Sequence, residues 1–224
     1  MTNTLHRHGQ AEDQKRDFIV FAIPCRGHNE QDSVPRLREF LRLALRHNPV
    51  NLGDAGHGAI FRPQNDLTPL AHWRRKDRPR WAEVAEGVST PTTVSAVFDS
   101  PEAVVGFLGD LRKADLGLSI NLSANVGAAR DCCQAAGITR HSVEYSLRYM
   151  GNTELLAESE VLELTTMCGH GMISFNFARK MLDWVREGRR TPEQAGRYLA
   201  RFCSCGIFNP TRASEVFAKV CGKH

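Results

Sequence analysis

The hydrophobic positions of the chain change their spacing several times, and each spacing predicts a different element. Phe18–Ile23 is an almost unbroken apolar run, which is typical of a strand buried on both faces. Val94–Phe98 and Leu116–Leu122 predict two further strands, while Ser142–Arg148 and Val161–Thr165 alternate in polarity like half-exposed strands. The pattern therefore predicts a sheet of about five strands.

Stripes of helical spacing lie between and after these strands. Apolar residues recur at every third or fourth position after Ser33 and after Ser100, two residues that suit helix N-caps. Residues 172–224 predict a helical C-terminal cover, in which Thr191-Pro192-Glu193-Gln194 reads as a capping box. The order of elements indicates an α/β (or α+β) class, with a mixed β-sheet covered by helices.

The chain of 224 residues is long enough for one domain with a substantial core. Residues 1–17 are polar and predict a flexible N-terminal arm, followed by a single α/β domain over 18–224. Residues 49–92 predict an irregular insertion, because they hold five of the ten prolines and a glycine-rich run. A long irregular segment inside a compact domain is often a functional cover.

Composition excludes several classes of protein. With 42% hydrophobic and 24% charged residues the chain fits neither a disordered nor a collagen-like protein. No apolar run reaches the length of a membrane span, and the N-terminus lacks the apolar core of a secretory signal. We therefore expect a cytoplasmic protein with no membrane partner. The sequence leaves open whether the chain forms a homo-oligomer.

The charge pattern disfavours nucleic acid as a partner, because the net charge is only +4. One segment, 72–81, concentrates basic residues between Trp73 and Trp81. Arginine and tryptophan together can bind phosphates and stack on bases. A solvated segment anchored by two buried tryptophans is the alternative, and a local clamp for a small anionic substrate fits the even charge balance better than a nucleic-acid surface.

Seven cysteines are the most unusual part of the composition. In a reducing compartment they are expected as thiols, metal ligands or buried apolar groups rather than disulfides. Cys132, Cys133 and Cys221 fall on apolar helical stripes, so we assign them to packing. The other four lie in loops that precede helices, where a thiolate is favoured.

Two of these loops share one design. Cys25 and His28 follow the first predicted strand, and Cys168 and His170 follow the last. If the two strands are parallel, both loops reach the same sheet edge, where ligands of α/β proteins bind. Gly169 and Gly171 would let the backbone approach a ligand closely, so Cys168 and His170 are the stronger candidates for catalysis. Tight turns with a half-buried cysteine are the alternative.

A third loop holds Cys203 and Cys205. With Cys168 they could provide three thiolates for an iron–sulfur cluster, or for zinc as the alternative metal. Arg212 lies close by in the sequence and could clamp an anionic group, unless it forms only a salt bridge. His57 lies among glycines in the irregular insertion and is a further catalytic or ligand candidate on a lid.

These features favour a cytoplasmic metal-dependent enzyme that performs Lewis-acid or redox chemistry on a small anionic substrate, for example a lyase, hydratase or sulfur-transfer reaction. The first alternative is a metal-free enzyme with Cys168 as nucleophile and a nearby histidine as base. The second is a non-enzymatic, redox- or metal-responsive binding module. The chain has no Gly-x-Ser-x-Gly elbow, no phosphate-binding glycine loop and no His-Glu-x-x-His helix.

Overall fold

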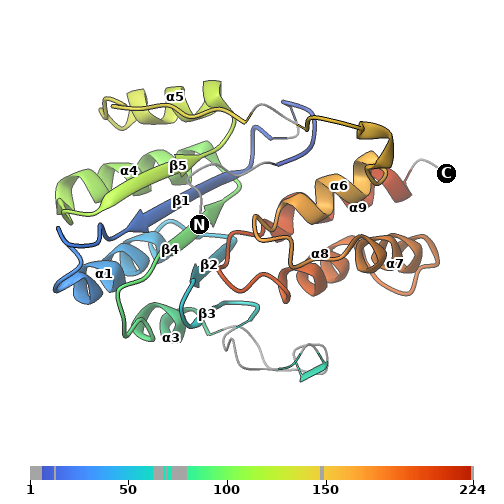
Figure 1. Ribbon diagram of the computed structural model, residues 1–224, viewed down its shortest axis with the longest axis horizontal. Helices are drawn as coiled ribbons and strands as arrows, with labels where there is room; N and C mark the ends of the chain where they lie inside the picture. Colours follow the sequence, from blue (N-terminus) through green and yellow to red (C-terminus); the bar gives the residue numbers. More distant parts are fainter. Residues whose placement is uncertain are drawn as a thin grey trace.

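The computed structural model describes residues 7–12, 14–62, 68, 70–71, 80–146 and 149–222. Within these ranges a five-stranded sheet forms the centre of the molecule (Figure 1). Its strands are β1 (Phe18–Ile23), β2 (Asn51–Asp54), β3 (Gly58–Ala59), β4 (Val94–Phe98) and β5 (Ser119–Ser123). The described helices are α1 (Ser33–Leu45), α3 (Trp81–Glu86), α4 (Pro101–Ala114), α5 (Val126–Ala135), α6 (Ser159–Thr166), α7 (Phe175–Arg186), α8 (Pro192–Ala200) and α9 (Pro210–Cys221), with a 3-10 turn at Thr153–Leu155. The expected α/β class is confirmed.

The strands lie in the order β3-β2-β4-β1-β5, and each described pairing is antiparallel. β1 is the second strand from one edge and is buried along its length, as its apolar sequence predicts. Because β4 separates β1 from β2, and β1 separates β4 from β5, helices α1 and α4 each connect strands that are not neighbours. The condition for two cysteine loops at one sheet edge, two parallel strands, is not met, because the Cys25 loop follows β1 whereas the Cys168 loop follows a helix, residues 159–166.

Each face of the sheet packs against its own layer of helices. Phe18, Val20 and Phe98 point into a core shared with α1, α3, α4 and α5. Ile19 and Phe21, one residue out of phase, point into a second core shared with α6, α7, α8 and α9. Figure 1 shows α6–α9 gathered on one side of the sheet. Because successive side chains of a strand point to opposite faces, alternate residues of β1 contribute to the two cores.

Two of the predicted strands do not form. Residues 159–166 are helix α6, because Val161, Leu164 and Thr165 recur at helical spacing and are all buried. Residues 142–146 have no regular structure, and 147–148 lie outside the described residues. The two missing strands are replaced by β2 and β3, which come from the predicted irregular insertion.

The segment expected as a flexible arm packs against the C-terminal helices. Arg7 donates to the main-chain oxygen of Met167 at 3.1 Å, and the His8 amide donates to Thr166 Oγ1 at 2.9 Å. Asp17 is 2% exposed. The N-terminal segment therefore helps to fix the end of α6, which leads directly into the Cys168 loop.

Candidate functional site

The Cys168 loop joins two helices rather than a strand and a helix. After α6 ends at Thr166, the Cys168 amide donates to Thr165 and the Gly171 amide donates back to Cys168. Gly171 has φ of +64°, which a glycine adopts without strain. Ser174 then caps α7 by accepting from the Phe177 amide. The sequence thus builds a tight turn, with Gly169, His170 and Gly171 exposed and Cys168 buried.

The Cys203–Cys205 loop joins α8 to α9 and is fastened to the sheet. Ser95 Oγ donates to the Cys205 carbonyl oxygen at 2.7 Å, and Asn51 Nδ2 donates to the Phe208 carbonyl oxygen at 2.8 Å. A Cβ atom at Gly53 would lie only 2.5 Å from the Cys205 carbonyl oxygen. The loop backbone therefore lies directly on β2, and a glycine at that point of the strand makes this approach possible.

The two loops bring four of the predicted site residues together. Cys203 Sγ lies 3.9 Å from Cys205 Sγ, and Cys205 Sγ lies 3.5 Å from His170 Nδ1. Cys168 shares a side-chain hydrogen bond with Cys203. The three sulfurs are buried, whereas His170 is exposed. We call these four residues the thiol–histidine cluster.

The protonation pattern follows the hydrogen bonds between the thiols. The hydrogen bond to Cys203, together with burial, raises the pKa of Cys168 far above its usual range. The hydrogen bond from Cys168 lowers the pKa of Cys203, but the bond to Cys205 and burial outweigh it and bring that pKa to about 12. The hydrogen bond from Cys203 lowers the pKa of Cys205. Of the three thiols in the cluster, Cys205 is therefore the favoured thiolate.

The Cys25 loop makes its described contacts away from the thiol–histidine cluster. Cys25 is exposed, and its amide and carbonyl groups bond within the 25–29 turn. Asn29 connects the turn to the carbonyl oxygen of Gly117, just before β5. His28 is exposed in the same turn. No described hydrogen bond of Cys25 or His28 leads to the thiol–histidine cluster.

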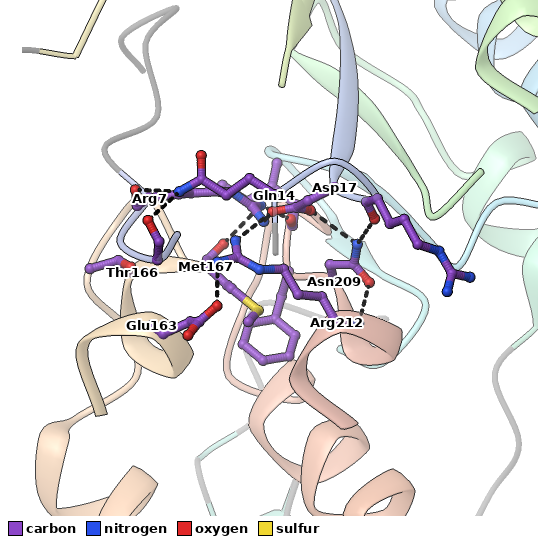
Figure 2. A network of polar contacts seen from close by, with 12 residues as sticks. Arg7, Gln14, Asp17, Glu163, Thr166, Met167, Asn209 and Arg212 are labelled. Atoms are coloured by element: carbon purple, nitrogen blue, oxygen red, sulfur yellow. Dashed lines mark hydrogen bonds and ion pairs between the residues drawn. The ribbon is translucent and has the colours of Figure 1, made fainter. Parts of the chain in front are cut away.

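Arg212 is a structural residue of the protein interior. It is 2% exposed, and its guanidinium group donates to Asp17 Oδ2 at 2.8 Å and to Glu163 Oε1 at 2.7 Å (Figure 2). A third bond reaches the His8 carbonyl oxygen. Figure 2 shows Arg7 and Asn209 converging on the same Asp17 carboxylate. Because both of its Nη atoms donate to groups of the protein and the side chain is buried, Arg212 does not take the anion-clamp role and forms the salt bridges that were the alternative.

His57 lies in a second polar arrangement. Its Nδ1 is 2.6 Å from Asp54 Oδ2, and its Nε2 is 2.7 Å from Ser89 Oγ. Asp54 and Ser89 are not among the site residues expected from the sequence. An acidic residue three positions before a histidine in a glycine-rich turn is the signal that identifies Asp54; Ser89 is 32 residues away from His57 and carries no local signal.

A cavity of about 750 Å³ lies along β5 and the segment after α5. Ser119, Asn121 and Ser123 line it, together with Asn125 at the N-cap of α5. The cavity is separate from the thiol–histidine cluster, none of whose residues line it. Basic segment 72–81 lies outside the described residues except for its last two positions, where Arg80 pairs with Glu83.

Among the residues that the structure describes, no group of three or more His, Cys, Asp and Glu side chains is arranged to hold a metal ion. No helix in the same part of the chain has the length and apolar character needed to cross a membrane. Comparisons with protein-family models, with curated proteins and with solved structures find no match to this chain.

Proposed function

We propose that the protein is a metal-dependent enzyme whose ion binds at the thiol–histidine cluster. The observation that carries this proposal is the pair of distances that join Cys203, Cys205 and His170. Two sulfurs at about 2.3 Å from one tetrahedral ion lie about 3.8 Å apart, and a sulfur and an imidazole nitrogen lie about 3.6 Å apart. The separations here are 3.9 and 3.5 Å.

These distances favour a single ion over an iron–sulfur cluster. In a cluster, thiolates bound to different irons are held further apart than two ligands of one ion. Zinc or one iron ion suits two thiolates and an imidazole. Because the described part of the chain has no group already closed around a centre, binding requires the three side chains to turn toward a common point.

Cys168 has a supporting role in this proposal. Its thiol hydrogen bond to Cys203 would orient that sulfur, as an outer partner of a metal ligand does. Three protein ligands leave one coordination position open, and an ion bound there can polarise a substrate oxygen. Arg62 lies beside the loop, where its Nη1 donates to the Phe202 carbonyl oxygen at 3.4 Å. Its positive charge at this place supports the proposal that the substrate is a small anion.

All seven cysteines are free, which supports a reducing compartment such as the cytoplasm.

A second candidate function uses the same residues without metal. The lowered pKa of Cys205 and its contact with His170 favour Cys205 as a thiolate nucleophile with His170 beside it. Cys168, the nucleophile expected from the sequence, is less suitable because its pKa is raised, whereas burial does not separate it from Cys205.

Metal and acid-labile sulfide analysis of protein purified without oxygen tests the proposal. We expect about one zinc or iron ion per chain and no acid-labile sulfide. Cys203→Ala, Cys205→Ala and His170→Ala should each reduce the bound metal at least about tenfold. Cys132→Ala, which removes an equally buried thiol on α5, is the matched control and should retain it.

Three results would count against the proposal. Metal content that is the same in the wild-type protein and in the Cys203→Ala/Cys205→Ala double variant would exclude this site. Iron and sulfide in equal amounts would indicate a cluster instead of one ion. A metal-free protein in which Cys205 is alkylated faster than Cys132 would favour the thiolate enzyme.

A further inference from the structure

We infer that Asp54, His57 and Ser89 form a second catalytic site, a serine nucleophile that accepts acyl groups from esters or thioesters. A carboxylate holds one ring nitrogen of the histidine, at 2.6 Å, and the serine oxygen lies 2.7 Å from the other. A nucleophile, a base and a group that orients the base, all within hydrogen-bond reach, is the arrangement that activates a hydroxyl. This site shares no residue with the thiol–histidine cluster.

Strand pairing explains why residues so far apart meet here. β2 and β4 are antiparallel, with Asp54 at the end of β2 opposite Val94 at the start of β4. The chain that leaves β2 and the chain that enters β4 therefore pass each other at one end of the sheet. His57 lies on the first of these segments and Ser89 on the second, and the Ala55 amide donates to the Thr93 carbonyl oxygen between them.

The contacts determine which nitrogen of His57 carries the proton. A carboxylate only accepts hydrogen bonds, so in the neutral ring Nδ1 must donate to Asp54 Oδ2. Nε2 is then an acceptor, and Ser89 Oγ is the donor in the 2.7 Å contact. This tautomer is the one in which the histidine can take the serine proton.

Both oxygens of Asp54 are used. Oδ1 accepts from the amides of Gly56, at 2.6 Å, and His57, at 3.3 Å, which leaves Oδ2 for the imidazole. The Asp54 side chain is 1% exposed, whereas 39% of the His57 side chain is exposed and Ser89 lies at the surface. The carboxylate is therefore fixed and shielded, while the nucleophile is open to a substrate.

The segment that carries Ser89 is also held in place. Val88 is fully buried, and its carbonyl oxygen accepts from Arg38 Nε of α1 at 2.9 Å. On the other segment, Ala59 and its neighbours pair with β2. Two anchored segments keep the Ser89–His57 distance short without a substrate, so less ordering is needed when a substrate binds.

The proposed reaction has two stages, acylation of Ser89 and hydrolysis of the acyl-serine. Ser89 Oγ forms a bond to the acyl carbon while its proton passes to His57 Nε2. The bond that breaks joins the acyl carbon to the leaving group, through oxygen in an ester and through sulfur in a thioester. The leaving group takes the proton from His57. Water then attacks the acyl-serine, His57 accepts one water proton and returns it to Ser89, and a carboxylic acid is released.

A fluorophosphonate, which phosphonylates activated serines with loss of fluoride, tests this site on the full-length protein. We expect one label per folded chain, found on the peptide that contains Ser89 by mass spectrometry. Ser89→Ala should abolish the label, and His57→Gln should slow it by about 100-fold or more. Thr90→Ala is the matched control for a neighbouring exposed hydroxyl and should label like the wild-type protein.

Asp54→Asn separates catalysis from folding. Its Oδ1 can still accept from the Gly56 and His57 amides, but its Nδ2 donates to the ring and forces the tautomer that cannot take the serine proton. We expect a cooperative thermal unfolding transition with labelling reduced by at least about tenfold.

The inference is overturned if the folded wild-type protein is not labelled, or if Ser89→Ala or Asp54→Asn is labelled at the wild-type rate. Labelling should be the same with and without a chelator, and the same in Cys203→Ala/Cys205→Ala. That control keeps this result distinct from the metal proposal, because either site can fail while the other is supported.

Discussion

Arg212 on α9 and Asp17, 195 positions earlier in the chain, form a buried ion pair with 2.8 Å between Nη1 and Oδ2. Arg7 and Glu163 extend it into a network of two guanidinium groups and two carboxylates. The network joins the segment before β1 to α6 and α9. It thereby links the start of β1 to the helix that precedes the Cys168 loop and to the helix that follows the Cys203–Cys205 loop.

We expect Arg212→Leu to destabilise the protein by about 3–5 kcal/mol, because it removes the guanidinium group paired with the buried Glu163 carboxylate and one of the two guanidinium groups that pair with Asp17. Glu215→Gln is the control, since it removes an ion pair with Arg16 in which 60% and 48% of the Arg16 and Glu215 side chains are exposed. That change should cost less than about 1 kcal/mol. Urea unfolding measures both, and equal losses for the two variants would contradict a structural role for Arg212.

Acid should weaken the same network. Burial raises the pKa of Asp17, but Arg7 and Arg212 lower it more, so the folded pKa lies below the unfolded one. The stabilisation from Asp17 is then complete above the unfolded value of about 3.9 and is lost as the pH falls through the folded pKa. In urea unfolding between pH 7 and pH 2.5, Asp17→Asn should be less stable than the wild-type protein at pH 7. The difference in unfolding free energy between the two proteins should narrow below about pH 4. A difference that stays constant with pH would contradict a lowered pKa of Asp17 in the folded protein.

The parts of the fold that follow from local sequence could be predicted. The apolar run of β1, the Ser100 cap of α4 and the Thr191–Gln194 capping box of α8 all form as expected. β2 was missed because Gly53 and Asp54 are poor strand formers. They are tolerated there because the strand lies against β4 and the Cys205 loop.

The candidate sites show the same division. Cys168, His170, Cys203 and Cys205 could be singled out because their residue types and glycine-rich turns are visible in the sequence. Ser89 could not, because its contact with His57 depends on the pairing of β2 with β4. The sequence left an anion clamp and a salt bridge open for Arg212, because its partners Asp17 and Glu163 come from distant segments.

Gly53→Ala should disturb the cysteine loop as well as stability. The added Cβ would lie 2.5 Å from the Cys205 carbonyl oxygen and 2.8 Å from the Gly206 Cα, so the loop must move away from β2. We expect a loss of about 1–3 kcal/mol, typical of overpacking. Gly109→Ala on α4 is the control, because its Cβ would meet nothing within 4 Å and alanine favours the helix. If both variants have the same stability by urea unfolding, the close approach of β2 to the loop is wrong.

Thiol reactivity in the native protein should separate the exposed Cys25 from the five buried cysteines, with the partly buried Cys221 between them. Cys25 is exposed, whereas Cys132 is buried and its pKa is raised to about 11 by burial and by Cys133 and Asp131. An aromatic disulfide reagent that absorbs on reaction should therefore show a fast phase from Cys25, at least about tenfold faster than the reaction of the five buried thiols, which need local opening. Cys25→Ser should remove the fast phase and leave the slow phases unchanged. A phase of the same rate that survives this substitution would contradict the prediction, because another thiol would then be as accessible as the exposed Cys25.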